Sequence, residues 1–349
     1  MEGYRAAIYR PREIGIEKFD IPCKQEPGFI LVEIQYSLVS PGTELRIYNS
    51  PPKQTFYPGY TAVGTVLETG KREDNHLKGK KVFLFPALDD DVCHCHSTHT
   101  LFKTSGLAIP LSTGLDPREA CFSRMINIAL TPYCNADPKI MGTVLVIGLG
   151  MVGNLVGQIG RIRGFYTIGI ESNATRRRRA LDSGFDVVLD PKEGNLIENV
   201  KSVTNGRGAD LTVNAAGETS LFIFAVQATA SGGEISTLGG APNSVQGDLA
   251  VVFSEVHARH LTIRGGWELN LPMRTAYASK VSSSEMNIDN AFRWLANRAV
   301  NLKPLWTHTI KPNEFKKTFD ALNQKDDSYL GIIVDWKNFS QNGLGNINK

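Results

Sequence analysis

Three glycines in one short stretch of this 349-residue chain have the spacing that binds a diphosphate group. Gly148, Gly150 and Gly153 follow the apolar run Val144–Ile147, which predicts a buried strand, and they precede a predicted helix over 154–163. In this setting the first glycine makes a tight turn, the second lets the backbone approach a pyrophosphate, and the third lets the helix pack on the strand. The free N–H groups at the start of the helix then favour an anion.

A carboxylate follows at the spacing expected for a ribose ligand. Glu171 ends the second predicted strand, about 20 residues after Gly148. An acid at this place accepts hydrogen bonds from the ribose hydroxyls and repels a 2′-phosphate, so the sequence favours NAD(H) over NADP(H). Ser172 and four arginines at 176–179 come next. Guanidinium groups bind phosphate, but consecutive helical residues point in different directions, so we expect only Arg176 to reach the cofactor.

Strands and helices alternate from about 144 to 263, which predicts a parallel, doubly wound sheet. The ligand crevice of such a sheet lies at the carboxyl ends of its strands, where the small-residue segments 214–218 and 238–242 fall. These segments either admit the cofactor or are plain turns. The predicted cofactor-binding residues are Gly148, Leu149, Gly150, Met151, Val152, Gly153, Glu171, Ser172, Arg176, Ala215, Ala216, Gly217, Leu238, Gly239 and Gly240.

The composition is that of an ordinary globular protein, with 42% hydrophobic and 21% charged residues. A net charge of +3 is too small to indicate a nucleic-acid partner or a membrane surface. No apolar run is long enough to span a bilayer, and the first residues lack a signal-peptide pattern. The five cysteines are odd in number and irregularly spaced, which favours a reducing compartment. We therefore predict a cytoplasmic, soluble protein of the size of an enzyme.

The residues outside the nucleotide-binding segment are rich in strand-like runs, and two of their loops carry a resemblance. With the glycine motif at 144–153, the segments Val39–Tyr48 (Val-Ser-Pro-Gly-Thr-Glu-Leu-Arg-Ile-Tyr) and Tyr57–Val66 (Tyr-Pro-Gly-Tyr-Thr-Ala-Val-Gly-Thr-Val) resemble the medium-chain dehydrogenase/reductase superfamily over nearly the whole chain. Within it, the Ser-Pro-Gly-Thr-Glu variant is most similar to the branch of threonine dehydrogenase and bacteriochlorophyllide dehydrogenase.

This resemblance implies an α/β fold in two domains. A β-rich GroES-like catalytic domain is expected at 1–124, completed by 268–349, with a Rossmann dinucleotide-binding domain inserted at 125–267. Superfamily members are commonly dimers through their cofactor domains, so a homodimer is expected. The resemblance also implies hydride transfer between a nicotinamide cofactor and a substrate.

Many members of this superfamily hold a catalytic zinc, and the sequence departs from them at each ligand position. Pro41 (or Ser40, if the loop is shifted by one) stands where the first cysteine would be. Tyr60 and Thr61 replace a His-Glu pair, and Arg124 falls at the third ligand position. Proline and arginine do not bind zinc, and tyrosine rarely does. We therefore predict that the catalytic zinc is absent.

A second group of metal-binding residue types follows in the segment 93–99. Cys93, His94, Cys95, His96 and His99 are five possible ligands in seven residues. Their spacing matches no standard zinc site, and alternate residues of a strand point to opposite faces. A strand whose imidazoles serve other purposes is favoured, and a metal site stays open. His96 or His99 is expected to line the substrate cleft.

Without zinc, another group must stabilise the alkoxide that hydride transfer leaves on a carbonyl. The resemblance places Thr43 where relatives carry a proton-relaying hydroxyl. Tyr60 either donates its phenol proton or packs beside Gly59. Arg124 either orients or polarises the substrate or, as favoured here, pairs with Glu44 or Glu119. The predicted catalytic residues are Thr43, Tyr60, His96 and Arg124.

The leading hypothesis is a zinc-independent NAD(P)(H)-dependent oxidoreductase that interconverts an alcohol and a ketone or aldehyde of a small polar metabolite. One alternative is an NADPH-dependent reductase of enone or quinone double bonds, which Glu171 argues against. Another is a nucleotide-binding protein without catalysis, against which Thr43 and the complete cofactor motif argue. The sequence does not identify the substrate or the direction of reaction.

Overall fold

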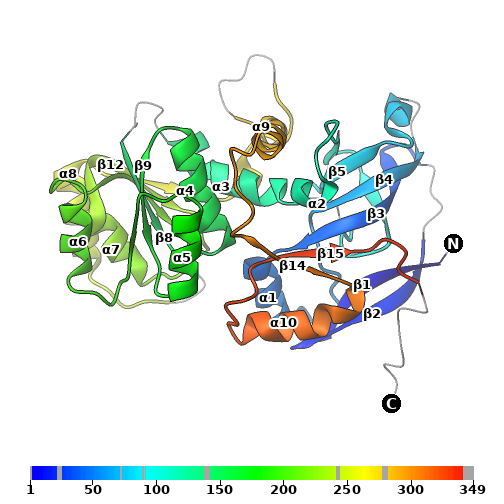
Figure 1. Cartoon of the computed structure of the whole chain (residues 1–349), viewed down its shortest axis with the longest axis horizontal. Helices are drawn as coiled ribbons and strands as arrows, with labels where there is room; N and C mark the ends of the chain where they lie inside the picture. Colours follow the sequence, from blue (N-terminus) through cyan, green and yellow to red (C-terminus); the bar gives the residue numbers. More distant parts are fainter. Residues whose placement is uncertain are drawn as a thin grey trace. The chain divides into compact units, whose positions relative to one another are not determined.

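A computed structural model of the chain describes residues 2–21, 26–70, 73–88, 90, 92–136, 142–240, 244–276 and 282–340 (Figure 1). Cys23 lies outside the described residues. The chain forms two compact units: the first contains residues 1–124 and 306–349, and the second contains residues 125–305. The second unit thus extends past 268, the position at which the sequence analysis returned the chain to its first domain.

The first unit is built mainly on antiparallel strands, with β14 and β15 paired in parallel. β1 (Glu2–Arg10) and β2 (Glu13–Asp20) form a hairpin, and a seven-stranded sheet has the order β14-β15-β3-β4-β5-β7, with β6 paired to β3. The strands of this sheet are β3 (Phe29–Val39), β4 (Ala62–Thr69), β5 (Lys81–Phe85), β6 (His99–Lys103), β7 (Leu107–Pro110), β14 (Trp306–Ile310) and β15 (Gly331–Asp335).

Two helices of the first unit, α1 (Pro41–Asn49) and α10 (Phe315–Asn323), pack together beside the sheets. Their apolar faces join the strands in one core through Tyr48, Phe319 and Trp336, all nearly without exposed surface. The Tyr48 hydroxyl also donates to a carboxylate oxygen of Asp320 at 2.7 Å. This packing fixes α1, which carries two residues of the candidate site. The remaining helical segments of the unit are α2 (Pro117–Ala120), the start of α3 (Ser123–Asn135), η1 (Glu73–Leu77) and η3 (Pro312–Glu314).

The second unit contains a six-stranded parallel sheet of order β10-β9-β8-β11-β12-β13. Its strands are β8 (Thr143–Ile147), β9 (Tyr166–Ile170), β10 (Val187–Leu189), β11 (Ala209–Asn214), β12 (Thr229–Thr237) and β13 (Thr262–Gly265). In chain order this is 3-2-1-4-5-6, so the topological switch point lies between β8 and β11, where doubly wound sheets bind nucleotides. The predicted α/β class, with a β-rich domain and a Rossmann domain, is confirmed.

Helices alternate with these strands: α4 (Met151–Ile162), α5 (Ala174–Asp182), α6 (Leu196–Ser202), α7 (Leu221–Ala228) and α8 (Leu249–Arg259), followed by η2 (Glu268–Asn270) and α9 (Ser284–Ala296). The sequence analysis began the first of these at 154, three residues late. Gly150 is the N-cap, so helical geometry begins inside the glycine motif. Within the part of the chain that the structure describes, no helix is long and apolar enough to cross a membrane.

Candidate functional site

The glycine turn has the geometry that a diphosphate site needs. Gly148 follows β8 with a φ of +85°, which favours glycine, and a Cβ there would lie 2.8 Å from Cα of Ala216. A Cβ on Gly153 would lie 1.9 Å from the carbonyl oxygen of Gly148. The fold itself therefore requires both glycines. A Cβ on Gly150, by contrast, would meet no atom within 4 Å, so space is open in front of the helix N-terminus.

Glu171 closes this turn from the neighbouring strand. Its buried carboxylate accepts the N–H of Leu149 at 2.9 Å and the N–H of Asn173 at 3.0 Å. The Ser172 hydroxyl is a further donor at 3.4 Å. A carboxylate has about four acceptor positions. With three donors in place, one position remains, so Glu171 can hold the glycine turn and still accept a hydrogen bond from a ribose hydroxyl.

Two of the four arginines at 176–179 form ion pairs within the second unit. Arg177 pairs with Asp190 at 2.7 Å, and Arg178 pairs with Asp182 at 3.1 Å on the exposed side of α5. These two arginines are held within the unit. Contact of Arg176 with a cofactor stays a prediction.

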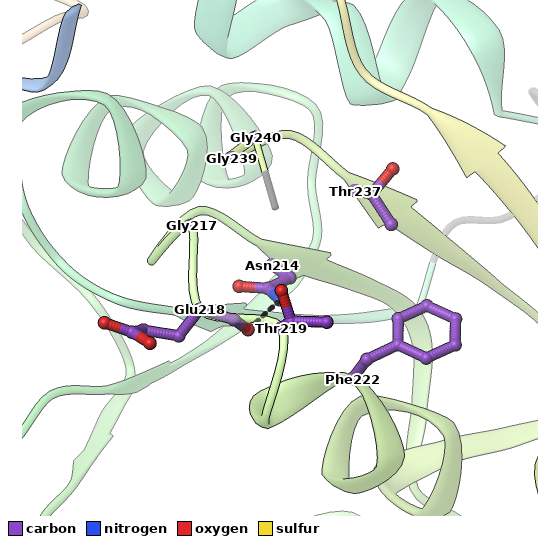
Figure 2. Close-up of a pocket in the computed structure, with 8 residues that line it drawn as sticks. All are labelled: Asn214, Gly217, Glu218, Thr219, Phe222, Thr237, Gly239 and Gly240. Atoms are coloured by element: carbon purple, nitrogen blue, oxygen red, sulfur yellow. Dashed lines mark hydrogen bonds between the residues drawn. The ribbon is translucent and has the colours of Figure 1, made fainter. Parts of the chain in front are cut away.

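A small pocket opens at the carboxyl ends of β11 and β12 (Figure 2). The predicted residues Gly217, Gly239 and Gly240 line it, and a Cβ on Gly239 would lie 2.5 Å from the backbone nitrogen of Gly217. Small residues therefore let the two strand ends come together. Asn214 and Glu218, which also line it, belong to the segment expected at the crevice but were not among the predicted cofactor-binding residues, and Thr219, Phe222 and Thr237 were missed. Thr237 ends a strand, which is the signal that could have found it. Ala241 and Pro242 of the second segment lie outside the described residues.

In the first unit, three of the predicted catalytic residues lie together. Thr43 is in the first turn of α1, Tyr60 precedes β4, and Arg124 lies near the start of α3. The Arg124 guanidinium lies 5.2 Å from the centre of the Tyr60 ring and 3.6 Å from that of Phe85. The Tyr60 hydroxyl donates to Oγ of Ser40 and also has a hydrogen bond with the Thr43 side chain. The cluster thus combines a phenol, two hydroxyls and a cation.

Burial sets the protonation state of the phenol. It raises the pKa of Tyr60 above the ordinary value near 10, and the nearby Glu44 carboxylate raises it further. The hydrogen bonds to Ser40 and Thr43 and the charge of Arg124 lower the pKa, but the net direction is upward. Tyr60 is therefore protonated near neutral pH and has a proton to donate.

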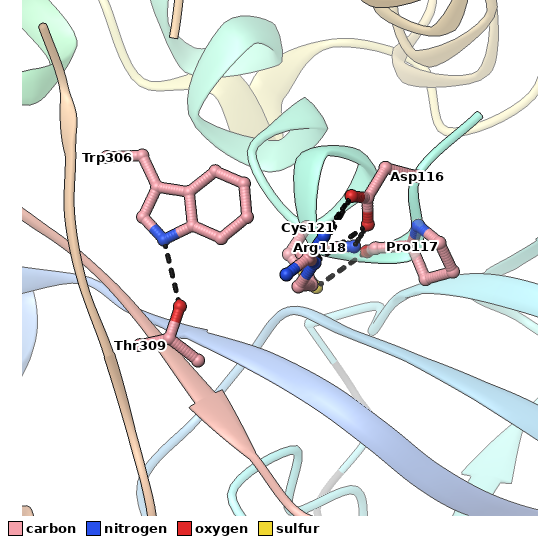
Figure 3. A network of polar contacts seen from close by, with 6 residues as sticks. All are labelled: Asp116, Pro117, Arg118, Cys121, Trp306 and Thr309. Atoms are coloured by element: carbon pink, nitrogen blue, oxygen red, sulfur yellow. Dashed lines mark hydrogen bonds and ion pairs between the residues drawn. The ribbon is translucent and has the colours of Figure 1, made fainter. Parts of the chain in front are cut away.

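The short helix α2 leads into α3, at whose start Arg124 lies. Asp116 caps α2 by accepting the backbone N–H of Arg118 at 2.8 Å, and its carboxylate also pairs with the Arg118 guanidinium (Figure 3). The Cys121 thiol donates to the carbonyl oxygen of Pro117 at 3.4 Å. Arg124 follows three residues later and has only 4% of its surface exposed.

His96 does not line a cleft. Its side chain has no exposed surface, Nδ1 lies 2.7 Å from Oγ of Ser37, and Nε2 lies 3.1 Å from Oε2 of Glu44. A fully buried imidazole cannot exchange a proton directly with a substrate. The structure therefore corrects the expectation that His96 borders the substrate cleft and places it behind the site.

The other residues of the segment 93–99 are dispersed. The Sγ atoms of Cys93 and Cys95 are 3.7 Å apart, whereas the His94 ring contacts Tyr57 and the half-buried His99 bonds to Thr98. Burial lowers the pKa of His99. Strand β6 begins only at His99, so the preceding residues form a loop where a strand was expected. Among the described residues, no group of three or more His, Cys, Asp or Glu side chains is placed to hold a metal ion.

Known proteins share both the sequence pattern and the fold. The family model described as "zinc-binding dehydrogenase" matches residues 151–283. L-threonine 3-dehydrogenase of Pyrococcus furiosus is 24% identical over 343 residues, covering 89% of this chain and 92% of that protein. The chain belongs to the medium-chain dehydrogenase/reductase superfamily.

Solved structures agree with this membership at the level of the fold. An alcohol dehydrogenase of E. coli CFT073 complexed with NADH has a TM-score of 0.80 at 16% identity, with 96% of this chain and 99% of that chain covered. A protein of Sinorhizobium meliloti 1021 described as a zinc-binding dehydrogenase, bound to NADP, has a TM-score of 0.76 at 18% identity, with 96% and 99% covered.

In this member of the superfamily, sequence reasoning missed Ser40 and Ser37, the hydroxyls that contact Tyr60 and His96. Ser40 could have been singled out only as a helix N-cap near the candidate catalytic Thr43. Ser37 lies in β3 and contacts His96 across 59 residues of sequence, a long-range contact that a local motif does not show.

Proposed function

We propose that this protein is an NAD(P)(H)-dependent oxidoreductase that transfers hydride between the cofactor and a small polar metabolite, interconverting an alcohol and a ketone or aldehyde without zinc. The observation that carries the proposal is the open helix N-terminus at Gly150, next to the buried carboxylate of Glu171. Superfamily membership supports the reaction class.

The cofactor preference that we propose is NAD(H). Both carboxylate oxygens of Glu171 are held by backbone N–H groups, so its negative charge is fixed where the 2′ position of the adenosine ribose would lie. A 2′-phosphate would meet this charge. Ser172 and Arg176 are proposed as neighbouring contacts, and the segments 215–217 and 238–240 as the inner wall of the crevice.

The residues around Tyr60 do not fit a catalytic zinc. They provide a phenol, two hydroxyls and the guanidinium of Arg124, and the carboxylate of Glu44 is occupied by His96 and by the backbone N–H of Ser40. Zinc prefers imidazole and thiolate, with carboxylate as a third choice. We therefore propose that hydrogen-bond donors and a fixed positive charge, instead of a Lewis acid, stabilise the alkoxide.

In this proposal the bound nicotinamide supplies or accepts the hydride. Tyr60 donates its phenol proton to the oxygen that becomes an alkoxide, and Thr43 supplies a second hydrogen bond. Arg124 provides a permanent positive charge in a buried environment, where such a charge acts more strongly than in water.

We further propose a homodimer. β13 ends the parallel sheet, and Ile263 and Trp267, 43% and 57% exposed, lie on and just after it. An exposed apolar edge strand is a site at which proteins pair with another chain. The cytoplasmic location and the absence of a nucleic-acid or membrane partner stay predictions from the composition.

Cofactor binding tests the proposal. We expect the protein to quench or shift NADH fluorescence with a Kd at least about 10-fold lower than that for NADPH, a difference of about 1.4 kcal/mol. Glu171→Ala should weaken NADH binding and reduce the difference between the Kd for NADPH and the Kd for NADH. Arg178→Ala changes only an exposed ion pair of the same segment and should leave both affinities unchanged. Failure to bind either dinucleotide, with the fold intact, would refute the proposed function.

Metal content is a separate prediction. Purified protein without a histidine tag should contain far less than one zinc per chain by elemental analysis, and a chelator should not alter its thermal unfolding. The reason is the donor set around Tyr60, which lacks thiolate and exposed imidazole. Stoichiometric zinc would contradict the proton-donor mechanism. If a Cys93→Ser variant then lost the zinc, the ion would be assigned to the segment 93–99.

A further inference from the structure

Ser40 is the N-cap of α1, yet its side chain does not cap the helix. A serine at this position ordinarily accepts an N–H of the first turn, a bond that contributes about 1 kcal/mol to helix stability. Here its Oγ accepts the hydroxyl proton of Tyr60. The serine hydroxyl is thus turned away from its local partner and toward the site.

Glu44 bonds back to Ser40 from one turn along α1. Its Oε1 accepts the backbone N–H of Ser40 at 3.3 Å, and the Ser40 carbonyl accepts the N–H of Glu44 at 2.9 Å. Glu44 has only 1% of its surface exposed. A buried carboxylate requires compensating donors, and its second oxygen finds one in His96 at 3.1 Å.

The hydrogen-bond partners of His96 orient its ring. A carboxylate can only accept, so Nε2 carries the proton that it donates to Oε2 of Glu44 at 3.1 Å. Nδ1 lies 2.7 Å from Oγ of Ser37. The indole N–H of Trp336 can only donate, and it donates to the same oxygen at 2.8 Å, so the tryptophan holds Ser37 beside Nδ1.

We propose that Glu44 and His96 are positioning residues for Tyr60: His96 fixes the Glu44 carboxylate, Glu44 fixes Ser40, and the Ser40 hydroxyl holds the phenol oxygen. The assignment of proton donation to Tyr60 rests on the proposed function. The chain of contacts from Trp336 to Tyr60 does not depend on it.

The Ser40 hydroxyl suits this task because it has one donor and two acceptor positions. It accepts from the phenol and can rotate to donate to the phenolate once the proton has left. The phenol oxygen therefore stays in place in both states. Its charged neighbours are Glu44, which disfavours the phenolate, and Arg124, which favours it. A carboxylate held beside the phenol keeps the proton on Tyr60 until a substrate oxygen takes it.

The test replaces Tyr60 with a fluorotyrosine, whose phenol is more acidic, and follows its ionisation by ¹⁹F NMR. Glu44→Gln keeps the shape but removes the charge, so the phenol pKa should fall by about 1 unit. Ser40→Ala removes a hydrogen bond that favours the phenolate, so the pKa should rise. Opposite shifts from two neighbouring variants are not expected from general loosening of the structure.

His96 is tested with two amides that each mimic one ring nitrogen. His96→Gln places an amide donor near the position of Nε2, so the fluorotyrosine at position 60 should keep the pKa that it has beside His96. His96→Asn places its amide near Nδ1, loses the bond to Glu44 and should shift the titration as Glu44→Gln does. His94→Asn is the matched control, because His94 contacts Tyr57 rather than Glu44, and it should have no effect.

Thermal unfolding of each variant identifies any that fail to fold, and the folded variants decide the outcome. Identical titrations in His96→Gln and His96→Asn, or no shift in Glu44→Gln, would overturn the positioning role. Because neither substrate nor cofactor takes part, the ¹⁹F results stand apart from the proposed function. The expected shifts together with absent dinucleotide binding would count against the proposed function alone.

Discussion

Gly150→Ala is expected to raise the Kd for NADH by about 10- to 100-fold, or about 1.4–2.8 kcal/mol, with little change in thermal stability. A methyl group at Gly150 touches no protein atom within 4 Å, and the backbone there does not have a positive φ. The folded chain therefore has room for it. The methyl group occupies the space in front of the α4 N-terminus, where a pyrophosphate would contact the backbone N–H groups.

Fluorescence titration with NADH measures the affinity, and thermal unfolding measures the stability. Gly148→Ala is the contrasting variant, because its Cβ would meet the backbone of Ala216 at 2.8 Å and its φ is +85°. It should lose stability and affinity together. An unchanged Kd in Gly150→Ala would mean that the dinucleotide does not cross this glycine, and the proposed binding mode would be wrong.

The nucleotide-binding half of the fold was predictable because its signals are local. The glycine spacing, the apolar run before it and the acid after the next strand all lie within about 30 residues, and right-handed crossovers limit the order of the strands. The start of α4 was misplaced because Gly150 combines two roles, N-cap and close backbone approach. Thr237 was missed although it ends a strand of this sheet.

The candidate site of the first unit was harder to predict because its contacts are long-range. Thr43, Tyr60 and Arg124 were found through a resemblance to family loops, and the structure brings them together. His96 or His99 was expected at the cleft because the equivalent strand in relatives borders it. The buried His96 instead contacts Glu44, 52 residues earlier, and Ser37 in β3. No periodicity in the sequence encodes such a pairing.

Gly59→Ala should strongly destabilise the first unit. Gly59 has a φ of +97°, and a Cβ there would lie 2.5 Å from the backbone nitrogen of His96 and 2.8 Å from its Cγ. Left-handed strain costs about 1–3 kcal/mol and forced overpacking about as much again, so we expect a loss of about 2–6 kcal/mol in the free energy of unfolding. The affected backbone leads directly to Tyr60, so its contact with Ser40 should be lost as well.

Denaturant unfolding followed by tryptophan fluorescence measures this loss, and Gly42→Ala is the control because a Cβ on Gly42, in α1, would meet open space. Gly59→Ala and Gly150→Ala should have opposite effects on stability and on cofactor binding. Gly59→Ala is expected to lower the stability while the second unit, which contains the Gly150 turn, still binds NADH. Gly150→Ala is expected to weaken NADH binding while the stability is retained. If Gly59→Ala unfolds at the wild-type midpoint, the segment before Tyr60 does not pack on His96. The contacts that hold the phenol would then have to be reassigned, because Tyr60 and His96 reach the same helix α1 through Ser40 and Glu44.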